Sequence, residues 1–513
     1  MLKKCEQNRL IFSTLGLISA LDHGVENICN YYLVIDRKTP FLTYAKAHSH
    51  TKIDVSRKKK NICKLKVILE DRMENNARDV VRQTMALVLA GGRGSRLKAL
   101  TDTRAKPSVY FGGKFRIIDF ALSNCVNSGI KGIGVVTQYK SHSLLRHLQA
   151  GWSFFRNQMN EYIDFLPASQ RLDEEHWYQG TADAIFQNVD IIKDHKPKYV
   201  LILAGDHIYK MDYANLILDH IRMGSPLTVA CIPVPKDQAK GFGVMNIDQN
   251  NLVTDFVEKP QDPPTMPNNP YMSLASMGIY VFDAEFLYDV LNKDAADKAS
   301  HRDFGMDIIP QLVKQGLVHA HDFSKSCIRN RGNKDIVYWR DVGTIDAYWE
   351  ANMDISSIEP QLDVYDFNWP IWTNQIQLPP AKMVQDINGT STICRNSITS
   401  AGCIISGSSL NQTVLFNSCR VHSNCFLSES VIMPFCIIHR ACRLTKVVMD
   451  RGCELPRGMI IGEDPELDAR RFYRSEGGVT LVTRAMLRKL RMTEPELFEG
   501  FDNYKAPVSM PSY

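Results

Sequence analysis

After about residue 390, aliphatic side chains recur at steps of five or six residues, a spacing that few folds can accommodate. The series is Ile404, Leu410, Leu415, Val421, Leu427, Ile432, Ile438, Leu444, Met449, Leu455 and Ile461. An α-helix requires a period of about 3.6 residues and a flat strand a period of about 2. Steps near six instead predict a triangular coil of short parallel strands, with about 17–18 residues in each turn. We therefore expect a left-handed parallel β-helix over residues 391–513.

The cysteines fit this interpretation. Six of them lie within the repeating region: Cys403, Cys419, Cys425, Cys436, Cys442 and Cys453. We interpret these residues as small apolar fillers of a narrow interior rather than as metal ligands, because no Cys-x-x-Cys pair occurs in the chain. The total of 13 is odd, and a chain of 513 residues needs no disulfides for stability. This usage is typical of reduced thiols in the cytoplasm, and we expect a cytoplasmic protein.

Residues 81–365 alternate between strand-like and helix-like segments. Apolar runs typical of buried strands occur at 85–90, 132–137, 199–205, 227–234 and 275–282, and helix-like patterns occur at 115–127 and 182–193. This alternation predicts an α/β domain whose largely parallel sheet is covered by helices on both faces. The proline- and asparagine-rich stretch at 260–270 is expected to form a surface loop, and residues 366–390, around the stretch 369–380, are expected to form a linker.

Residues 1–80 show little sustained apolar periodicity, and we expect a poorly ordered N-terminal extension. Residues 1–72 hold 14 Lys and Arg against 7 Asp and Glu, whereas the remainder is close to neutral. That balance gives the body of the protein no general electrostatic basis for binding nucleic acid. Residues 10–21 are similar to a short secretory signal, but the cysteines argue against export. No stretch reaches about 18 uncharged apolar residues, which excludes a membrane span.

A glycine-rich segment, Leu-Ala-Gly-Gly-Arg-Gly-Ser-Arg-Leu at 89–97, is the first candidate for binding chemistry. A strand that runs into glycines exposes backbone N–H groups that can bind phosphate, and Arg93 and Arg96 add positive charge. It is not a Walker loop, and Leu97 stands where the dinucleotide fingerprint has its third glycine. A glycine-rich turn alone is often only a tight connection, but the interleaved arginines favour a polyphosphate ligand.

Two carboxylates and two lysines complete the candidate chemistry. Asp206 follows a buried strand at the edge where α/β sheets bind ligands, and Asp341 precedes a glycine turn. The two could hold Mg²⁺ beside a triphosphate, although a lone Asp at the start of a loop is more often a helix cap. Lys106 and Lys259 each precede a proline, which disfavours helix at the lysine. This inventory favours catalysis by positioning and charge neutralisation over covalent catalysis.

Taken together, five motifs resemble the bacterial glucose-1-phosphate adenylyltransferase (ADP-glucose pyrophosphorylase) family. They are Ala-Gly-Gly-Arg-Gly-Ser-Arg-Leu at 90–97, Arg-Ala-Lys-Pro at 104–107, Gly-Gly-Lys-Phe-Arg-Ile-Ile-Asp-Phe-Ala-Leu-Ser-Asn at 112–124, Ala-Gly-Asp-His-Ile-Tyr at 204–209 and Phe-Val-Glu-Lys-Pro at 256–260. Segments 177–183, 273–280 and 339–344 extend the resemblance, which covers about 84–490. It implies a Rossmann-like nucleotidyltransferase domain and a β-helix for assembly and regulation, in a chain that is usually homotetrameric.

The resemblance also implies an activity and residue roles. The family joins ATP and α-D-glucose 1-phosphate to give ADP-glucose and pyrophosphate, the first committed step of glycogen synthesis. The residues that match its catalytic groups are Arg93, Lys106, Asp206 and Lys259, and those that match its Mg²⁺ ligands are Asp206 and Asp341. Those that match its glucose 1-phosphate site are Tyr178, Gly243, Glu258, Lys259 and Ser276. Those that match its nucleotide site are Gly91, Gly92, Arg93, Gln138 and Gly180.

Regulation is where the sequence departs from the family pattern. The residues that match positions for a sugar bisphosphate activator and the inhibitor AMP are Thr103, Arg104, Arg116 and Arg451. Enzymes activated by fructose 1,6-bisphosphate commonly have a lysine where this chain has Thr103, and a histidine where it has Tyr110. Because a hydroxyl cannot offset a phosphate dianion, we expect weak or shifted activation.

Three alternatives stay open on the residues alone. Another sugar-1-phosphate nucleotidyltransferase would share the phosphate-handling groups, although residues 177–178 and the β-helix favour adenylyl transfer to glucose. A non-catalytic regulatory subunit should have lost a metal carboxylate or a phosphate-binding lysine. This chain retains both carboxylates, at 206 and 341, and both lysines, at 106 and 259. A hexapeptide acyltransferase would need a catalytic histidine in a glycine-rich setting, which His422 and His439 do not have.

Overall fold

The computed structural model describes residues 78–92, 94–168, 177–330, 332 and 336–499, together with three short strands nearer the N-terminus. The chain divides into two compact units, Met1–Asp79 and Val80–Tyr513. The strands of the first unit are β1 (Ile11–Phe12), β2 (Tyr31–Ile35) and β3 (Leu42–Lys46), in the sheet order β1-β3-β2. Residues 78–80 of the expected N-terminal extension are also described, and its remaining residues lie outside the described ranges. No helix in the described ranges is both long and apolar enough to cross a membrane.

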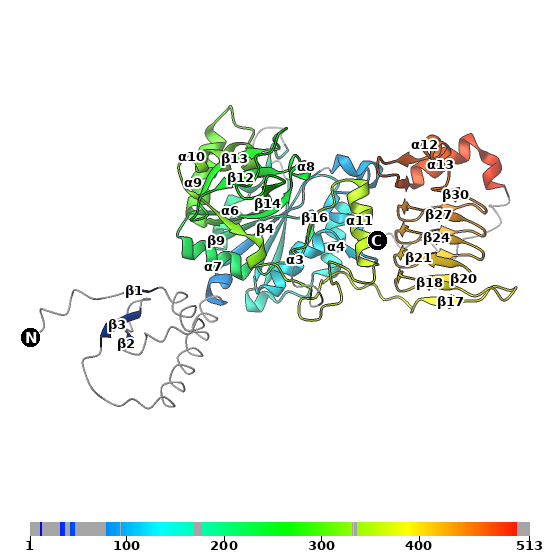
Figure 1. The fold of residues 1–513 in the computed structure, drawn as a ribbon, viewed down its shortest axis with the longest axis horizontal. Helices are drawn as coiled ribbons and strands as arrows, with labels where there is room; N and C mark the ends of the chain where they lie inside the picture. The colour runs from blue at the N-terminus through cyan, green and yellow to red at the C-terminus, as the bar shows by residue number, and fades with distance from the viewer. Residues whose placement is uncertain are drawn as a thin grey trace, which may run out of the picture. The chain divides into compact units, whose positions relative to one another are not determined.

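The second unit opens with a nine-stranded sheet (Figure 1). Four neighbouring strands run parallel: β9 (Tyr199–Ala204), β4 (Thr84–Leu89), β7 (Gly132–Thr137) and β8 (Tyr162–Pro167). The strands that extend the sheet beyond β9 are β14 (Met272–Asp283), β12 (Gly243–Ile247), β13 (Val253–Glu258), β11 (Leu227–Pro235) and β15 (Val318–Asp322). Strand β14 is antiparallel to β9 and to β11, so the antiparallel part of the sheet begins there.

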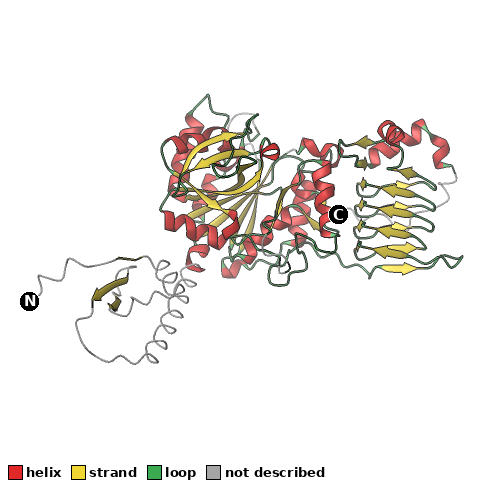
Figure 2. Ribbon diagram, viewed as in Figure 1, coloured by secondary structure: helices red, strands yellow, loops and turns green. Residues whose placement is uncertain are grey.

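Helices cover both faces of this sheet, as the continuous apolar strands require (Figure 2). The α-helices are α3 (Ile118–Asn127), α4 (His142–Gly151), α5 (Thr181–Phe186), α6 (Val189–Asp194), α7 (Tyr213–Met223), α8 (Lys236–Ala239), α9 (Ala284–Ala296), α10 (Ile309–Lys314) and α11 (Ile345–Ile355). Short 3-10 segments are η2 (Ser95–Thr101), η3 (Lys106–Ser108), η4 (Asn157–Met159) and η6 (Phe323–Lys325), and η5 (Phe304–Ile308) is a π-helix. Helix α7 starts where Asp212 accepts a hydrogen bond from the Ala214 N–H and ends at Gly224, with φ of 64°.

Two helix expectations need correction. The predicted helix over 115–127 begins only at Ile118, because β6 (Phe115–Arg116) pairs with β5 (Tyr110–Phe111) in a hairpin. The predicted helix over 182–193 is divided into α5 and α6 at Asn188. There the Asn188 side chain bonds to the Ala184 carbonyl instead of facing solvent. Such a side-chain contact competes with the backbone ladder and ends the first helix.

The second domain of this unit is the predicted β-helix, whose parallel rungs appear as stacked strands in Figure 2. One sheet contains β17 (Lys382–Val384), β20 (Ile404–Ser406), β23 (Arg420–Val421), β26 (Ile437–Ile438) and β29 (Glu454–Leu455). The second contains β18 (Ile393–Arg395), β21 (Ser409–Asn411), β24 (Phe426–Ser428), β27 (Arg443–Thr445) and β30 (Ile460–Ile461). The third contains β19 (Ile398–Thr399), β22 (Val414–Leu415), β25 (Val431–Ile432), β28 (Val447–Met449), β32 (Thr480–Val482) and β31 (Tyr473–Arg474). Beyond the rungs lie α12 (Pro465–Arg471), α13 (Arg484–Thr493) and η7 (Pro495–Phe498).

The predicted interior register holds with one exception. Leu410 is paired with Leu427, and Leu427 with Leu444, so equivalent aliphatic residues stack in adjacent rungs. Ile404 was expected inside but is 37% exposed, and its neighbour Ile405 is fully buried instead. Because both residues are isoleucines and the steps alternate between five and six, the spacing did not distinguish them.

The six cysteines of the repeat are buried, as expected for interior fillers, and they are free thiols. Several of these thiols donate a hydrogen bond to the backbone carbonyl of a residue 14 positions later in the chain. The Cys436 thiol lies 3.1 Å from the Asp450 oxygen, and the Cys442 thiol lies 3.1 Å from the Pro456 oxygen. The column of thiols therefore fills the interior and also satisfies backbone acceptors.

Residues 356–381, all of them described, contain neither helix nor strand and connect the two domains. The connection is fixed to α3, which presents Asp119, Ser123 and Asn127 four residues apart on one helical face. Thr373 Oγ1 donates to Asp119 Oδ2 at 2.6 Å, the Trp372 N–H donates to Ser123 Oγ at 2.8 Å, and Asn127 Nδ2 donates to the Pro370 oxygen at 2.9 Å. The connection thus runs along α3 in the opposite direction to the helix.

One buried ion pair joins the domains directly. Arg104, from the α/β domain, donates through Nη1 to Asp450 Oδ1 at 2.8 Å and through Nη2 to Oδ2 at 3.1 Å. Asp450 directly follows β28 of the β-helix. Burial lowers the pKa of the Arg104 guanidinium, but the charge of Asp450 outweighs this effect and the net pKa is raised.

Candidate active site

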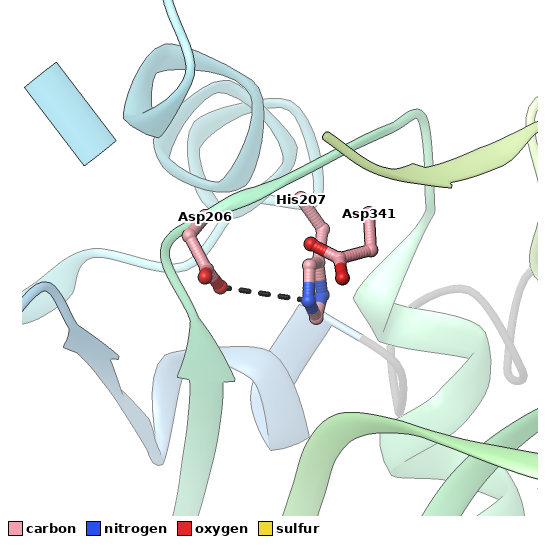
Figure 3. A group of neighbouring side chains, drawn as sticks. All are labelled: Asp206, His207 and Asp341. Carbon is pink, nitrogen blue, oxygen red and sulfur yellow. Dashed lines mark ion pairs between the residues drawn. The ribbon is translucent and has the colours of Figure 1, made fainter. Parts of the chain in front are cut away.

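Strand pairing brings the two predicted carboxylates together. Strand β10 (His207–Tyr209) runs antiparallel to β16 (Trp339–Asp341), with His207 opposite Asp341. Asp206 therefore lies at the same end of this two-stranded sheet as Asp341. The potential ligand atoms of Asp206, His207 and Asp341 all lie within 4.8 Å of one another (Figure 3). This group is suited to holding a divalent metal ion.

The structure adds His207 to the expected pair. Its Nε2 lies 3.5 Å from Asp206 Oδ1, the contact marked by the dashed line in Figure 3. The sequence motif contained this histidine, but a histidine after an aspartate carries no signal of its own. Its position became clear only from the pairing of β10 with β16, two strands far apart in the sequence.

Lys106 lies between the two carboxylates. Its Nζ donates to Asp206 Oδ2 at 2.9 Å and to Asp341 Oδ1 at 2.6 Å, and the lysine side chain is only 4% exposed. Burial lowers the pKa of Lys106, but the two carboxylate charges outweigh it and the net pKa is raised. Burial likewise raises the pKa of Asp206, and the Lys106 charge more than reverses this, leaving the pKa well below its usual range. The Asp206 carboxylate is therefore ionised, as a cation site requires.

The glycine-rich segment forms the adjacent wall. Gly91 and Gly92 line a cavity of about 430 Å³, while Arg93 lies outside the described residues. Gly94 has φ of 62°, and a Cβ at this position would lie 2.8 Å from Lys106 Cβ. Glycine at 94 thus allows the loop to pass directly over the lysine.

The same cavity collects most of the other predicted residues. Those that line it are Gly91, Gly92, Gln138, Tyr178, Gly180, Asp206, Glu258 and Lys259. Lys106 and Asp341 are connected to the cavity through Asp206, which lines it. Lys106 forms one ion pair with Asp206 and a second with Asp341. Gly243 and Ser276 are not among the described residues that line the cavity. Gly243 packs behind it, since a Cβ there would lie 2.8 Å from Glu258 Oε2.

Glu258 and Lys259 line the end of the cavity that lies beyond the cluster of Asp206, His207 and Asp341. Lys259 Nζ donates to Glu258 Oε1 at 2.6 Å, and the Lys259 side chain is 59% exposed. Lys259 has φ of 45°, the left-handed region that a lysine seldom adopts. Backbone strain of this kind persists where surrounding structure enforces it and is concentrated at functional sites. The strained backbone holds an ammonium group at the cavity mouth.

Sequence reasoning missed a third wall, made by Asp303, Phe304 and Gly305. The Asp303 carboxylate accepts from the Gly305 and Met306 N–H groups at the start of η5. A Cβ on Gly305 would lie 2.6 Å from Glu258 Oε2, so this wall is in close contact with the Glu258 carboxylate. No pattern in the surrounding sequence distinguishes these residues from an ordinary helix start.

Burial lowers the pKa of Arg116, and the charges of Arg104 and Arg451 lower it further, so these three of the four predicted regulatory residues lie near one another. Arg116 lines a second cavity of about 340 Å³, together with Tyr110, Lys114 and Arg146. Thr103 is exposed, Arg104 is buried in the Asp450 ion pair, and neither they nor Arg451 are among the described residues that line this cavity. The Arg116 guanidinium lies over the Tyr110 ring at 4.9 Å, which places Tyr110 within the same cluster.

Comparison with known proteins agrees with this fold. The nucleotidyl transferase family matches residues 85–358, and a GlmU-like C-terminal hexapeptide family matches residues 379–482. The chain is therefore an enzyme of the nucleotidyltransferase class. A glucose-1-phosphate adenylyltransferase from Enterobacter sp. (strain 638) is 57% identical over 428 residues, which cover 82% of this chain and 99% of that protein. At this level of identity, the chain belongs to the glucose-1-phosphate adenylyltransferase family, as the motifs indicated.

Proposed function

We propose that this enzyme transfers the adenylyl group of ATP to α-D-glucose 1-phosphate, with release of pyrophosphate and formation of ADP-glucose, at the start of glycogen synthesis. The name of the Enterobacter relative supports this substrate pair. The observation that carries the proposal is the cavity itself. Its glycine-rich wall and acidic group suit a nucleoside triphosphate, and Glu258 with Lys259 suits a sugar that carries a phosphate.

In this mechanism a phosphate oxygen of glucose 1-phosphate attacks the α-phosphate of ATP, and pyrophosphate leaves. Asp206 and Asp341 would hold Mg²⁺, which when bound neutralises phosphate charge. The backbone N–H groups of Gly91 and Gly92 receive the phosphates, and Gln138 and Gly180 contact the nucleoside. Lys106, with Arg93, stabilises the negative charge that grows on the leaving pyrophosphate.

The sugar phosphate is bound at the opposite end. Lys259 neutralises its phosphate, Glu258 accepts from sugar hydroxyls, and Tyr178 packs beside the ring. Gly243 allows the Glu258 carboxylate its position, and Ser276 lies on the neighbouring strand β14. Because the reacting groups are bound in one cavity, catalysis consists of positioning and charge neutralisation rather than a covalent enzyme intermediate.

Regulation and assembly are part of the same proposal. A sugar bisphosphate activator and AMP would bind near Arg116, where Lys114 and Arg146 add two more cations between the domains. Arg104 would act there indirectly, through its ion pair to Asp450, with Thr103 and Arg451 at the margin. We further propose a cytoplasmic homotetramer with a catalytic domain at 81–365 and a regulatory β-helix. The β-helix begins at β17 (Lys382–Val384) rather than at the expected residue 391, because β17 pairs with β20, and the expected linker at 366–390 is correspondingly shorter.

The deciding experiment measures pyrophosphate release from the purified enzyme with each of four nucleoside triphosphates and several sugar 1-phosphates. We expect the highest kcat/KM for ATP with glucose 1-phosphate, and dependence on Mg²⁺. Preference for another base or sugar would instead identify a different sugar-1-phosphate nucleotidyltransferase. Absence of turnover with every pair would favour a non-catalytic regulatory subunit, and acetyl transfer to a sugar would favour a hexapeptide acyltransferase.

A further inference from the structure

Within the segment 177–183, no role was assigned to Asp183, although it is among the most buried charged groups near the cavity. It lies in the first turn of α5 and is 2% exposed. A buried carboxylate is costly unless it is paired and hydrogen-bonded. The partners that compensate Asp183 belong to two different walls of the active-site cavity.

The first partner belongs to the wall that contains Tyr178. The Gln179 N–H donates to Asp183 Oδ2 at 2.9 Å, and Gln187 Nε2 donates to the same oxygen at 2.9 Å. Tyr178, Gln179 and Gly180 all line the cavity. The carboxylate thus fixes the backbone of this wall from behind, without contacting the cavity.

The second partner belongs to the wall that contains Asp303. Arg302 Nη1 donates to Asp183 Oδ1 at 3.2 Å, and the Arg302 carbonyl accepts from the Ala182 N–H at 2.9 Å. Thr181 Oγ1 also donates to Asp303 Oδ2 at 3.0 Å. The two walls are therefore bonded to each other directly behind the cavity.

The fit between these walls is close. A Cβ on Gly180 would lie 2.2 Å from the Arg302 oxygen, so only glycine allows the backbones to approach this far. Arg302 itself has φ of 57°, in the left-handed region. Its strained backbone is held in place by contacts such as the Asp183 ion pair.

We infer that Asp183, through Arg302 and the Gln179 N–H, is a positioning residue that sets the distance between the Tyr178 wall and the Asp303 wall and so the affinity for the sugar phosphate. This inference rests on the proposed function, which places glucose 1-phosphate between these walls. Of the residues assigned to the nucleotide, Gly91, Gly92 and Gln138 follow β4 and β7, and only Gly180 belongs to the Tyr178 wall, so nucleotide binding depends less on the ion pair.

The test compares Arg302→Met with Arg302→Lys in the full-length enzyme. Arg302→Met removes the ion pair from its more exposed end, and we expect the KM for glucose 1-phosphate to rise roughly tenfold, on the scale of a small misplacement of binding groups. The KM for ATP should change less than about threefold, because most of the nucleotide site is carried by the glycine-rich wall, which the ion pair does not contact. Arg302→Lys retains the charge and should restore most of the affinity. Asp183→Asn should behave like Arg302→Met if it folds.

A matched control is available on α7. Arg222 Nη1 donates to the buried Asp219 at 2.9 Å, and neither residue is among the described residues that line the cavity. Arg222→Met should leave both KM values unchanged. A second readout is amide hydrogen exchange in a peptide that spans 178–187, which should become faster in Arg302→Met but not in Arg222→Met.

The inference and the proposed function fail in different ways. If the unsubstituted enzyme shows no turnover with ATP and glucose 1-phosphate, the proposed function is refuted. If the unsubstituted enzyme is active and Arg302→Met leaves the sugar phosphate KM unchanged, the positioning role is overturned, whatever happens to hydrogen exchange. Equal increases in both KM values would overturn it as well, because the effect would then be a general loss of order.

Discussion

Removal of one partner from the Arg104–Asp450 ion pair should destabilise the protein strongly. The two side chains are 6% and 11% exposed, and the guanidinium makes two short contacts with the carboxylate. Replacement of Arg104 by Met leaves the Asp450 carboxylate buried without its cation. Breaking such a buried pair typically costs about 3–5 kcal/mol, most of it from the uncompensated charge.

The double variant Arg104→Met/Asp450→Leu separates this cost from a simple loss of packing. When both charges are absent, no unpaired ion remains, and the free energy of unfolding should recover by at least about 2 kcal/mol relative to Arg104→Met. Arg443→Met is the matched control, because Arg443 and Glu463 form a pair at 2.8 Å whose side chains are 52% and 37% exposed. An exposed pair of this kind contributes less than about 1 kcal/mol.

The assay is urea unfolding followed by circular dichroism and by pyrophosphate release, so that loss of structure and loss of activity are compared at each concentration. The shift in midpoint, multiplied by the slope of the unfolding curve, gives the change in free energy. The reasoning is refuted if Arg104→Met unfolds within about 1 kcal/mol of the unsubstituted protein, which is the range of an exposed pair. It is equally refuted if the double variant is no more stable than the single one.

Four further predictions concern catalysis, the extension and regulation. Asp206→Asn should retain a normal circular dichroism spectrum and lose at least about 10²-fold in kcat, because a ligand of the metal is removed; unchanged kcat at limiting Mg²⁺ would exclude that role. Lys259→Ala should mainly raise the KM for glucose 1-phosphate, whereas Lys106→Ala should mainly lower kcat; identical kinetic patterns would contradict the division of roles. A chain that begins at Met73 should match the full chain in thermal midpoint, in oligomer mass by light scattering and in kcat, and a large decrease in any of them would assign the extension a structural role. Thr103→Lys should lower the half-activating concentration of fructose 1,6-bisphosphate about tenfold, the equivalent of roughly 1.4 kcal/mol. If the unsubstituted enzyme is already strongly activated and the substitution does not change this activation, the activator pocket lies elsewhere.

The elements with strong local signals were predictable from the sequence. Strand β7 (Gly132–Thr137) has the predicted bounds, and the β-helix register is correct at every predicted position except Ile404. These predictions succeed because period and burial are coupled along a single segment. The break at Asn188 was not predictable, since it depends on a side chain that bonds to Ala184 after both are folded.

The site was predictable in its residue types but not in its arrangement. The aspartates 206 and 341 were expected to face one ligand, and they do lie in one group, but the bridging position of Lys106 comes from contacts over 100 and 235 residues. The ion-pair partner of Arg104, Asp450, is 346 residues away in the chain and could not be predicted from the motif that contains Arg104. Long-range pairs of this kind leave no periodic trace in a single sequence.

The connection along α3 bears on how the enzyme would respond to proteolysis. Three of its contacts, to Asp119, Ser123 and Asn127, lie within residues 370–373, and Lys210 adds a contact to Asp366 at 3.1 Å. A single cut between residues 374 and 381 would therefore leave residues 366–373 bound to the catalytic domain through their contacts with α3 and Lys210. The Arg104–Asp450 pair would still join the two fragments. Nicked protein would then run as two bands under denaturing conditions but elute as one species from a sizing column, and it would retain its catalytic machinery.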